Sequence, residues 1–201
     1  LKPASTDPIS ALWLAKLAYE AGIPEGGFQV LPASTGDIQP VIQDDRVKMI
    51  TFTGSAEVGW SLKAKSGKKR VALELGGNAG VIIDKGCNMD YALKRCLMGS
   101  FAYSGQVCIS LQRILIHRDI YDEFVEKMVD GVKNTVKVGD PLDEDVMVSA
   151  MIREEDSKRV ESWVNEAVED GAKVLVGGER DGSIYKPTIL ANVKRDMKVY
   201  K

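Results

Sequence analysis

The amino-acid sequence predicts an α/β fold of parallel, doubly wound sheets. Short apolar runs of strand length alternate with longer segments that carry apolar residues at helical spacing. Glycine or proline stands where helical segments stop, as at Gly22, Pro24 and Gly171. Because strand, helix and strand in succession form the repeating unit of parallel sheets, these observations together indicate this class.

The first part of the chain is expected to alternate between helix and strand up to Leu75. The hydroxyl of Ser5 or Thr6 is placed to cap the first helix, and Pro8 suits its first turn. Pro40 is compatible with the second helix only because it falls in the first turn. After the first helix, the expected elements are a strand over 28–31, a helix over 37–43, a strand over 47–52, a helix over 55–64 and a strand over 71–75.

Gly76-Gly77 marks the expected boundary between two domains, one over residues 1–75 and one over residues 76–201. The second region again alternates between strand and helix. Its expected elements are a strand over 80–83, a helix over 89–103, a strand over 113–117, helices over 121–136 and 155–170, and strands over 173–176 and 188–190.

Composition excludes several classes of protein. An apolar fraction of 44% and a charged fraction of 28% are those of a soluble globular protein. A net charge of −2 gives no reason to expect nucleic acid or an anionic membrane as a partner. No apolar run is long enough to cross a bilayer, and no signal peptide is expected. The three cysteines lack metal-site spacing, so no zinc site is expected and a reducing, cytoplasmic setting fits best.

Cys108 is the candidate nucleophile. It ends the stretch Gly105-Gln106-Val107-Cys108, which lies between a helical pattern and a strand-like run and has small residues on both sides. A thiolate in such a place attacks carbonyl carbon readily. The alternative is a buried, inert cysteine, the more common fate of an isolated one. Cys96, within a helical pattern, is expected to be of that kind, and Cys87 is expected to be structural too.

A candidate phosphate site begins at Gly54. The stretch Gly54-Ser55-Ala56-Glu57-Val58-Gly59 follows an expected strand and opens an expected helix. A helix start offers unpaired N–H groups and positive dipole to a pyrophosphate, and ligands of parallel sheets bind at the carboxyl ends of the strands. The stretch is not a Walker loop, because Trp60 replaces the lysine. The alternative is a helix that Ser55 merely caps.

Four short motifs fall in the order and at the spacings of the aldehyde dehydrogenase superfamily, which the chain resembles from Lys2 to its last residue. They are Lys2-Pro3-Ala4-Ser5, Phe52-Thr53-Gly54-Ser55, Glu74-Leu75-Gly76-Gly77 and Gly105-Gln106-Val107-Cys108. Family members are much longer, so the chain resembles an internal segment whose α/β fold is truncated at both ends. The resemblance implies that residues 1–75 are part of the dinucleotide-binding domain and residues 76–201 part of the catalytic domain.

The resemblance also implies a chemistry. Cys108 would attack an aldehyde, a hydride would pass to NAD or NADP, and water activated by Glu74 would hydrolyse the resulting thioester. The residues that the resemblance assigns to the dinucleotide are Lys2, Ser5, Thr53, Gly54, Ser55 and Leu75.

Ser5 bears on the choice between NAD and NADP. Many NAD-preferring members carry a glutamate there, which holds the ribose hydroxyls and repels a 2′-phosphate. Serine removes that repulsion, and Lys2 could pair with the phosphate. We expect NADP to be tolerated, with the preference left open. The alternative is that Ser5 only caps its helix.

Other functions stay open on the sequence alone. A coenzyme A-acylating semialdehyde dehydrogenase would have the same fold, although Glu74 favours hydrolysis. The isolated segment is expected to be inactive, at most a dinucleotide-binding or packing module, because the family's oxyanion asparagine and nicotinamide-ribose glutamate fall outside it.

The parent enzyme is expected to be a cytoplasmic homo-oligomer, a dimer or tetramer. Members of the resembled family that act on phosphorylated aldehydes can carry an arginine just before the nucleophile. Here that residue is Val107, which favours a small aliphatic or hydroxy-aldehyde as substrate over a phosphorylated one.

Overall fold

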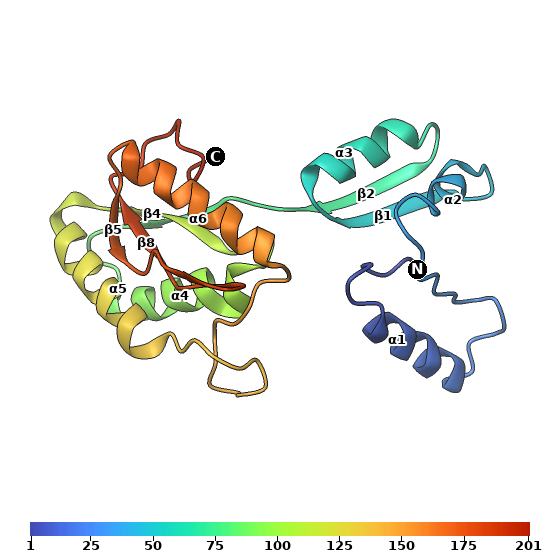
Figure 1. The fold of residues 1–201 in the computed structure, drawn as a ribbon, viewed down its shortest axis with the longest axis horizontal. Coiled ribbons are helices and arrows are strands. Elements are labelled where there is room, and N and C mark those ends of the chain that lie inside the picture. Colours follow the sequence, from blue (N-terminus) through green and yellow to red (C-terminus); the bar gives the residue numbers. More distant parts are fainter. The chain divides into compact units, whose positions relative to one another are not determined.

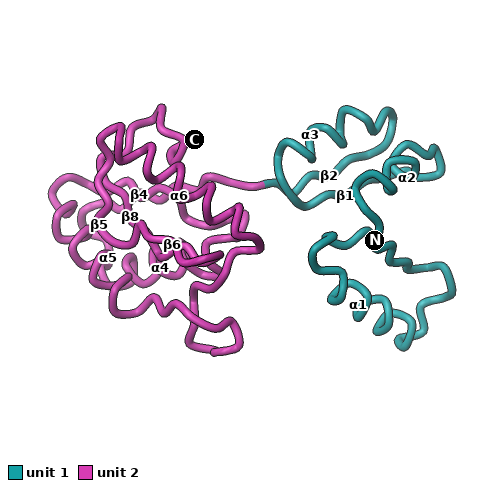
Figure 2. The backbone as a smooth tube through the Cα atoms, in the orientation of Figure 1, with its two compact units in different colours: residues 1–75 teal, residues 76–201 magenta.

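A parallel pair of strands lies at the centre of each of the two units into which the chain divides. The computed structural model describes residues 1–201. The first unit comprises Leu1–Leu75 and the second Gly76–Lys201 (Figure 2). The parallel pairing confirms the predicted α/β class. No helix combines the length and the apolar character that a membrane span needs.

In the first unit, β1 (Met49–Gly54) pairs in parallel with β2 (Arg70–Leu75). The crossover is α3 (Ala56–Lys65), which lies along the pair (Figure 1). Gly59 of α3 is buried, and a Cβ added to it would come within 2.5 Å of Leu75 Cδ2. The glycine therefore lets the helix pack directly on the strand, and the two carboxyl ends of the strands stay beside the start of α3.

The region before β1 differs from the prediction in two ways. Its helices are α1 (Ile9–Glu20) and α2 (Gln39–Gln43), with Pro40 in the first turn of α2 as expected. The N-cap of α1 is Pro8, without a side-chain bond, so the predicted cap by Ser5 or Thr6 is wrong. The predicted strand over 28–31 is also wrong. Apart from a local bond from the Ala33 N–H to the Leu31 carbonyl, the backbone of this segment bonds only to Leu1, and the sheet of this unit has no third strand. In this unit α1 buries none of its residues.

The second unit is built on β3 (Ala79–Ile83) and β4 (Leu111–Ile116), joined by the crossover helix α4 (Met89–Phe101). The next helix, α5 (Tyr121–Thr135), packs against α4 (Figure 1). Ile83, Cys96, Phe124 and Met128 form the buried centre of this packing. Cys96 is 3% exposed, which confirms it as a core residue. Cys87, expected to be structural, is exposed.

The last third of the chain contains an antiparallel departure from the predicted alternation. After α6 (Glu154–Glu169), β5 (Lys173–Val176) pairs antiparallel with β8 (Ile189–Ala191). Between them lies the hairpin of β6 (Arg180–Asp181) and β7 (Ile184–Tyr185), which the sequence did not predict. Parallel pairing needs a long crossover, and no helix separates β5 from β8. The connection is therefore one that suits an antiparallel pair.

Candidate active site

The carboxyl ends of β1 and β2 bring several of the predicted site residues together. The strand register sets Thr53 beside Glu74 and Gly54 beside Leu75. Glu74 and Thr53 are exposed, whereas Leu75 is half-buried and faces Gly59 of α3. This end of a parallel pair is where such sheets bind ligands, so the arrangement leaves one carboxylate accessible at the edge of a potential ligand site.

Ser55 completes that edge as the N-cap of α3. Its backbone is extended, with φ −69° and ψ 148°, and its Oγ accepts a hydrogen bond from the backbone N–H of Val58 at 3.4 Å. The capping role considered from the sequence is therefore present. It leaves the N–H groups of Ala56 and Glu57 without an acceptor in the helix, because the first residues of a helix have none. These donors, beside an accessible Gly54, fit an anionic group such as a pyrophosphate.

Lys2 and Ser5 lie in the irregular segment that precedes α1. The Lys2 Nζ donates to the carbonyl of its neighbour Pro3, so the side chain folds back on its own backbone. Ser5 is exposed and forms no cap. Neither side chain makes a hydrogen bond to the ends of β1 and β2. Their predicted contact with a dinucleotide thus stays a prediction.

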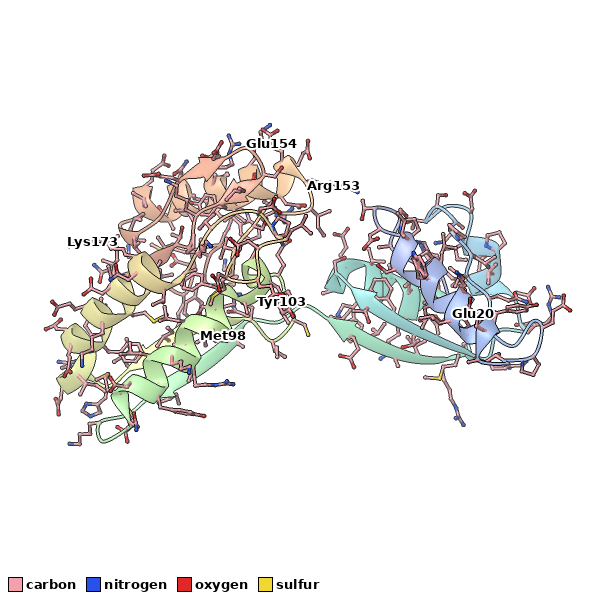
Figure 3. The ribbon with its side chains drawn as sticks, turned by 90° about the horizontal axis from the view of Figure 1, so that it is seen from below. Glu20, Met98, Tyr103, Arg153, Glu154 and Lys173 are labelled. Carbon is pink, nitrogen blue, oxygen red and sulfur yellow. The ribbon has the colours of Figure 1, made fainter.

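Cys108 is reached through a left-handed turn. The helix predicted to run to residue 103 ends at Phe101, and Tyr103 (φ 52°, ψ 40°), Ser104 (φ 57°, ψ 27°) and Gly105 (φ 69°) follow in left-handed conformations. Right-handed helix cannot continue through these angles, so the chain leaves the helix axis. Figure 3 labels Met98 within α4 and Tyr103 beyond the end of that helix.

The Cys108 thiol is exposed at the tip of the turn that follows. The backbone N–H of Ser110 donates to the carbonyl of Val107 at 2.9 Å and closes this turn around Cys108. The Cys108 side chain is exposed, and its backbone N–H donates to no acceptor within the chain. A thiol and a free amide on one exposed residue can attack a carbonyl and hold the oxygen that becomes negative.

Gly77 fixes how closely the neighbouring segment approaches this turn. A Cβ added to Gly77 would lie 2.5 Å from the backbone oxygen of Cys108, closer than atoms of this kind pack. A Cβ on the adjacent Gly76 would meet nothing within 4 Å. Only one of the two motif glycines is therefore needed for close backbone approach within this unit.

Arg113 is a site-supporting residue that the sequence analysis missed. Its Nη2 donates to the carbonyl of Asn78 at 2.8 Å and its Nη1 to the Tyr200 hydroxyl at 3.3 Å. The guanidinium also lies over the Tyr200 ring, 5.1 Å from the centroid, and Asn78 Nδ2 donates to the Tyr200 carbonyl at 2.6 Å. Arg113 thus joins β4, the residue after Gly77 and the last turn of the chain. The sequence feature that could have indicated Arg113 is its charge within the otherwise largely apolar strand 111–116.

The buried cysteine is chemically distinct from Cys108. Burial raises the pKa of the Cys96 thiol, and the nearby Cys87 raises it further. A thiol with a raised pKa stays protonated at neutral pH and is a poor nucleophile. Cys108 and Cys87 are thus the accessible thiols of the chain. No group of three or more His, Cys, Asp or Glu residues is placed to hold a metal ion.

Comparisons with known proteins match the whole chain to aldehyde dehydrogenases. The sequence model of the Aldehyde dehydrogenase family matches residues 1–201. The chain is 47% identical over 200 residues to the 3-sulfolactaldehyde dehydrogenase of Priestia megaterium, covering 99% of this chain and 42% of that protein. It is 39% identical over 207 residues to the NADP(+) succinate-semialdehyde dehydrogenase of Escherichia coli, covering 100% of this chain and 43% of that protein.

A solved structure shows the same fold. The crystal structure of aldehyde dehydrogenase 21 from Physcomitrella patens, in complex with the reaction product succinate, aligns with a TM-score of 0.95 and 42% identity. The alignment covers 100% of this chain and 42% of that one. The chain therefore spans less than half the length of the proteins it matches.

Replacing Gly77 with alanine should disturb the Cys108 turn, whereas replacing Gly76 should not. The Cβ at Gly77 forces the Cys108 carbonyl to move, and such overpacking costs about 1–3 kcal/mol of unfolding free energy. Gly76→Ala has open space and should leave stability unchanged or raise it by about 0.4–1 kcal/mol. Urea unfolding followed by far-UV circular dichroism measures both. Equal stabilities for the two variants would contradict the close approach.

Proposed function

The chain belongs to the aldehyde dehydrogenase family, and from this premise we propose that it is part of an enzyme that oxidises an aldehyde to a carboxylic acid with NAD or NADP. The observation that carries the proposal is Cys108, an exposed thiol with a free backbone amide in a turn that Gly77 supports. It is the residue of this chain best suited to form a covalent intermediate with a carbonyl compound.

The first step of the proposed reaction takes place at the sulfur atom of Cys108. The Cys108 thiolate attacks the aldehyde carbon and forms a thiohemiacetal, and the developing oxyanion accepts a hydrogen bond from the free N–H of Cys108. Loss of a hydride from this carbon converts the adduct to a thioester. Formation of the thioester divides the oxidation into two smaller barriers, because the acyl group stays bound until water removes it.

Glu74 is the proposed base for the second half of the reaction. Its carboxylate is exposed at the end of β2, so it is open to solvent and able to take a proton from water. The resulting hydroxide attacks the thioester and releases the acid, and the thiolate of Cys108 is restored. The presence of a carboxylate at this position supports hydrolysis as the fate of the thioester.

The dinucleotide, when bound, supplies the acceptor for the hydride. The residues proposed to hold it are those at the carboxyl end of β1 and the start of α3, with Leu75 beside them and Lys2 and Ser5 for the adenosine ribose. The free N–H groups at the start of α3 fit its pyrophosphate. Ser5 carries no charge that would repel a 2′-phosphate, and a relative is named for NADP(+), so we propose that NADP is accepted.

The proposed substrate is a short aliphatic or hydroxy-aldehyde. The relatives that match the chain are named for 3-sulfolactaldehyde, lactaldehyde and succinate semialdehyde, which are all small. The residue before the nucleophile, Val107, is apolar and offers no charge to a phosphate group. The three named aldehydes are therefore the first compounds to assay.

Cys108→Ala in the full-length enzyme should lower aldehyde oxidation by at least about a thousandfold, because the covalent route is lost. Cys87→Ala is the matched control, since Cys87 is also exposed and lies in the same unit. Its turnover should stay within about twofold of wild type. Cofactor reduction followed by absorbance measures both, and unchanged turnover in Cys108→Ala would overturn the assignment.

Glu74→Gln should slow release of the acid while leaving hydride transfer intact, because an amide cannot accept the proton of water. Rapid-mixing absorbance should then show a burst of reduced cofactor followed by slow steady turnover. Loss of burst and steady phase to the same extent would indicate a structural role for Glu74. Analysis of the wild-type products with and without coenzyme A tests whether the thioester is hydrolysed or transferred.

Ser5→Glu should weaken use of NADP more than use of NAD, because the added carboxylate repels a 2′-phosphate. Ser10→Glu places the same charge on the exposed face of α1 and serves as the control. The ratio of kcat/KM for the two cofactors is the quantity to compare. A ratio that Ser5→Glu leaves unchanged, or that Ser10→Glu changes as much, would show that Ser5 does not face the ribose.

A further inference from the structure

The left-handed turn before Cys108 needs support from elsewhere in the fold. Only three residues other than glycine have a positive φ, and two of them, Tyr103 and Ser104, are consecutive and lie at this turn. The Cβ atom makes the left-handed region unfavourable for such residues. A backbone of this kind persists where its surroundings fix it, and such sites concentrate near functional groups.

Ser104 supplies the fixing contacts. Its Oγ accepts a hydrogen bond from the backbone N–H of Ser149 at 2.8 Å and donates to the carbonyl of the same residue at 3.1 Å. The backbone N–H of Ser104 donates to the carbonyl of Met147 at 3.3 Å. Three hydrogen bonds therefore join Ser104 to the short segment from Met147 to Ser149.

The segment that receives these bonds is itself firmly held. Val148 is 3% exposed and lies in a buried cluster with Val132 and Val136. The backbone N–H groups of Met147 and Val148 donate to the carbonyl of Lys137 at 3.0 and 3.1 Å. A turn tethered to this segment is thus tethered to the core beneath α5 rather than to a surface loop.

The residues between Ser104 and Ser110 have few other restraints. Gln106, Val107, Cys108 and Ile109 are all exposed. Ser110 returns the chain towards α4 through a 3.4 Å bond from its Oγ to the carbonyl of Ser100. Besides the backbone bonds of Ser104 and Gln106, the side chain of Ser104 restrains the entry of the nucleophile turn, four residues before the thiol.

From this geometry we infer that Ser104 is a positioning residue for Cys108. Its hydroxyl locks the left-handed entry of the turn to the Ser149 backbone and thereby sets the direction in which the thiol points. The inference rests on the proposed function, because the orientation of the thiol matters for attack on a carbonyl carbon. Ser104 itself touches neither substrate nor reacting atoms.

Two substitutions in the full-length enzyme separate the loss of the Ser104 hydroxyl from the strain of a left-handed backbone at this position. Ser104→Ala removes both Oγ bonds and keeps the Cβ in a left-handed conformation. Ser104→Gly removes the same bonds and relieves the backbone, so it should fold even where the alanine variant does not. Both should lower kcat about tenfold or more with little change in KM for the cofactor. Both should also speed hydrogen exchange of the Ser149 N–H, which reports the tether without any catalytic assay.

Ser157→Ala is the matched control. The Ser157 Oγ is fully buried and lies 2.8 Å from the carbonyls of both Glu154 and Gly182, so its loss removes a hydroxyl of similar kind at the start of α6. This variant should lose stability at least as much as Ser104→Gly and keep kcat within about twofold of wild type.

The outcomes distinguish the positioning role from the proposed function. If wild-type enzyme oxidises none of the small aldehydes, the proposed function fails and the positioning role fails with it. If wild type is active and Ser104→Gly retains its kcat, the positioning role alone is wrong. An equal loss of kcat in Ser157→Ala would also overturn it, because the effect would then follow stability rather than the orientation of Cys108.

Discussion

The close approach of Gly77 to the Cys108 backbone is the constraint on which the candidate site depends. A reactive thiol must be accessible, yet its backbone must be fixed if the sulfur is to meet a carbonyl carbon at a set angle. Exposed turns rarely satisfy both demands. Here Gly77 passes the Cys108 carbonyl at a distance that excludes a Cβ, while Ser104 ties the entry of the turn to a buried segment. The side chain of Cys108 thus stays in solvent while its main chain is held from two sides.

Arg113 extends the same framework to the end of the chain. Its guanidinium bonds to the carbonyl of Asn78, which directly follows Gly77, and stacks on Tyr200. The position of the Gly77 segment is therefore set by a residue on the strand that leaves the nucleophile turn. Asn78, Arg113 and Tyr200 thus form one hydrogen-bonded unit, and the Cys108 backbone lies against it at Gly77.

The sequence predicted those parts of the fold that local pattern controls. The strands and helices from β1 to α5 lie within a few residues of their predicted bounds, because apolar spacing and helix-ending residues determine them. The strand expected over 28–31 failed because strand formation needs a neighbour, which this unit lacks. The antiparallel pairing of β5 with β8 was missed, because the pattern of a short strand does not reveal its partner's direction.

Features of the site that depend on distant residues were not predictable in the same way. Neither Tyr103 nor Ser104 favours a left-handed conformation by itself, so the predicted helix continued through Tyr103. The side-chain bonds that hold this turn reach Ser149, and one bond of Arg113 reaches Tyr200, 87 residues away. By contrast, strand order alone places the Thr53-Gly54-Ser55 turn at the carboxyl end of a strand, where the structure has it, while its role in binding stays a prediction.

The most direct test of the central claim is to locate the acyl group during turnover. Full-length enzyme carrying Glu74→Gln is mixed with NADP and succinate semialdehyde, quenched in acid within the first turnover, digested and analysed by peptide mass spectrometry. The account predicts a succinyl thioester on the peptide that contains Cys108, formed only when both aldehyde and cofactor are present. An acyl group on Cys87, or no covalent adduct while reduced cofactor accumulates, would contradict it.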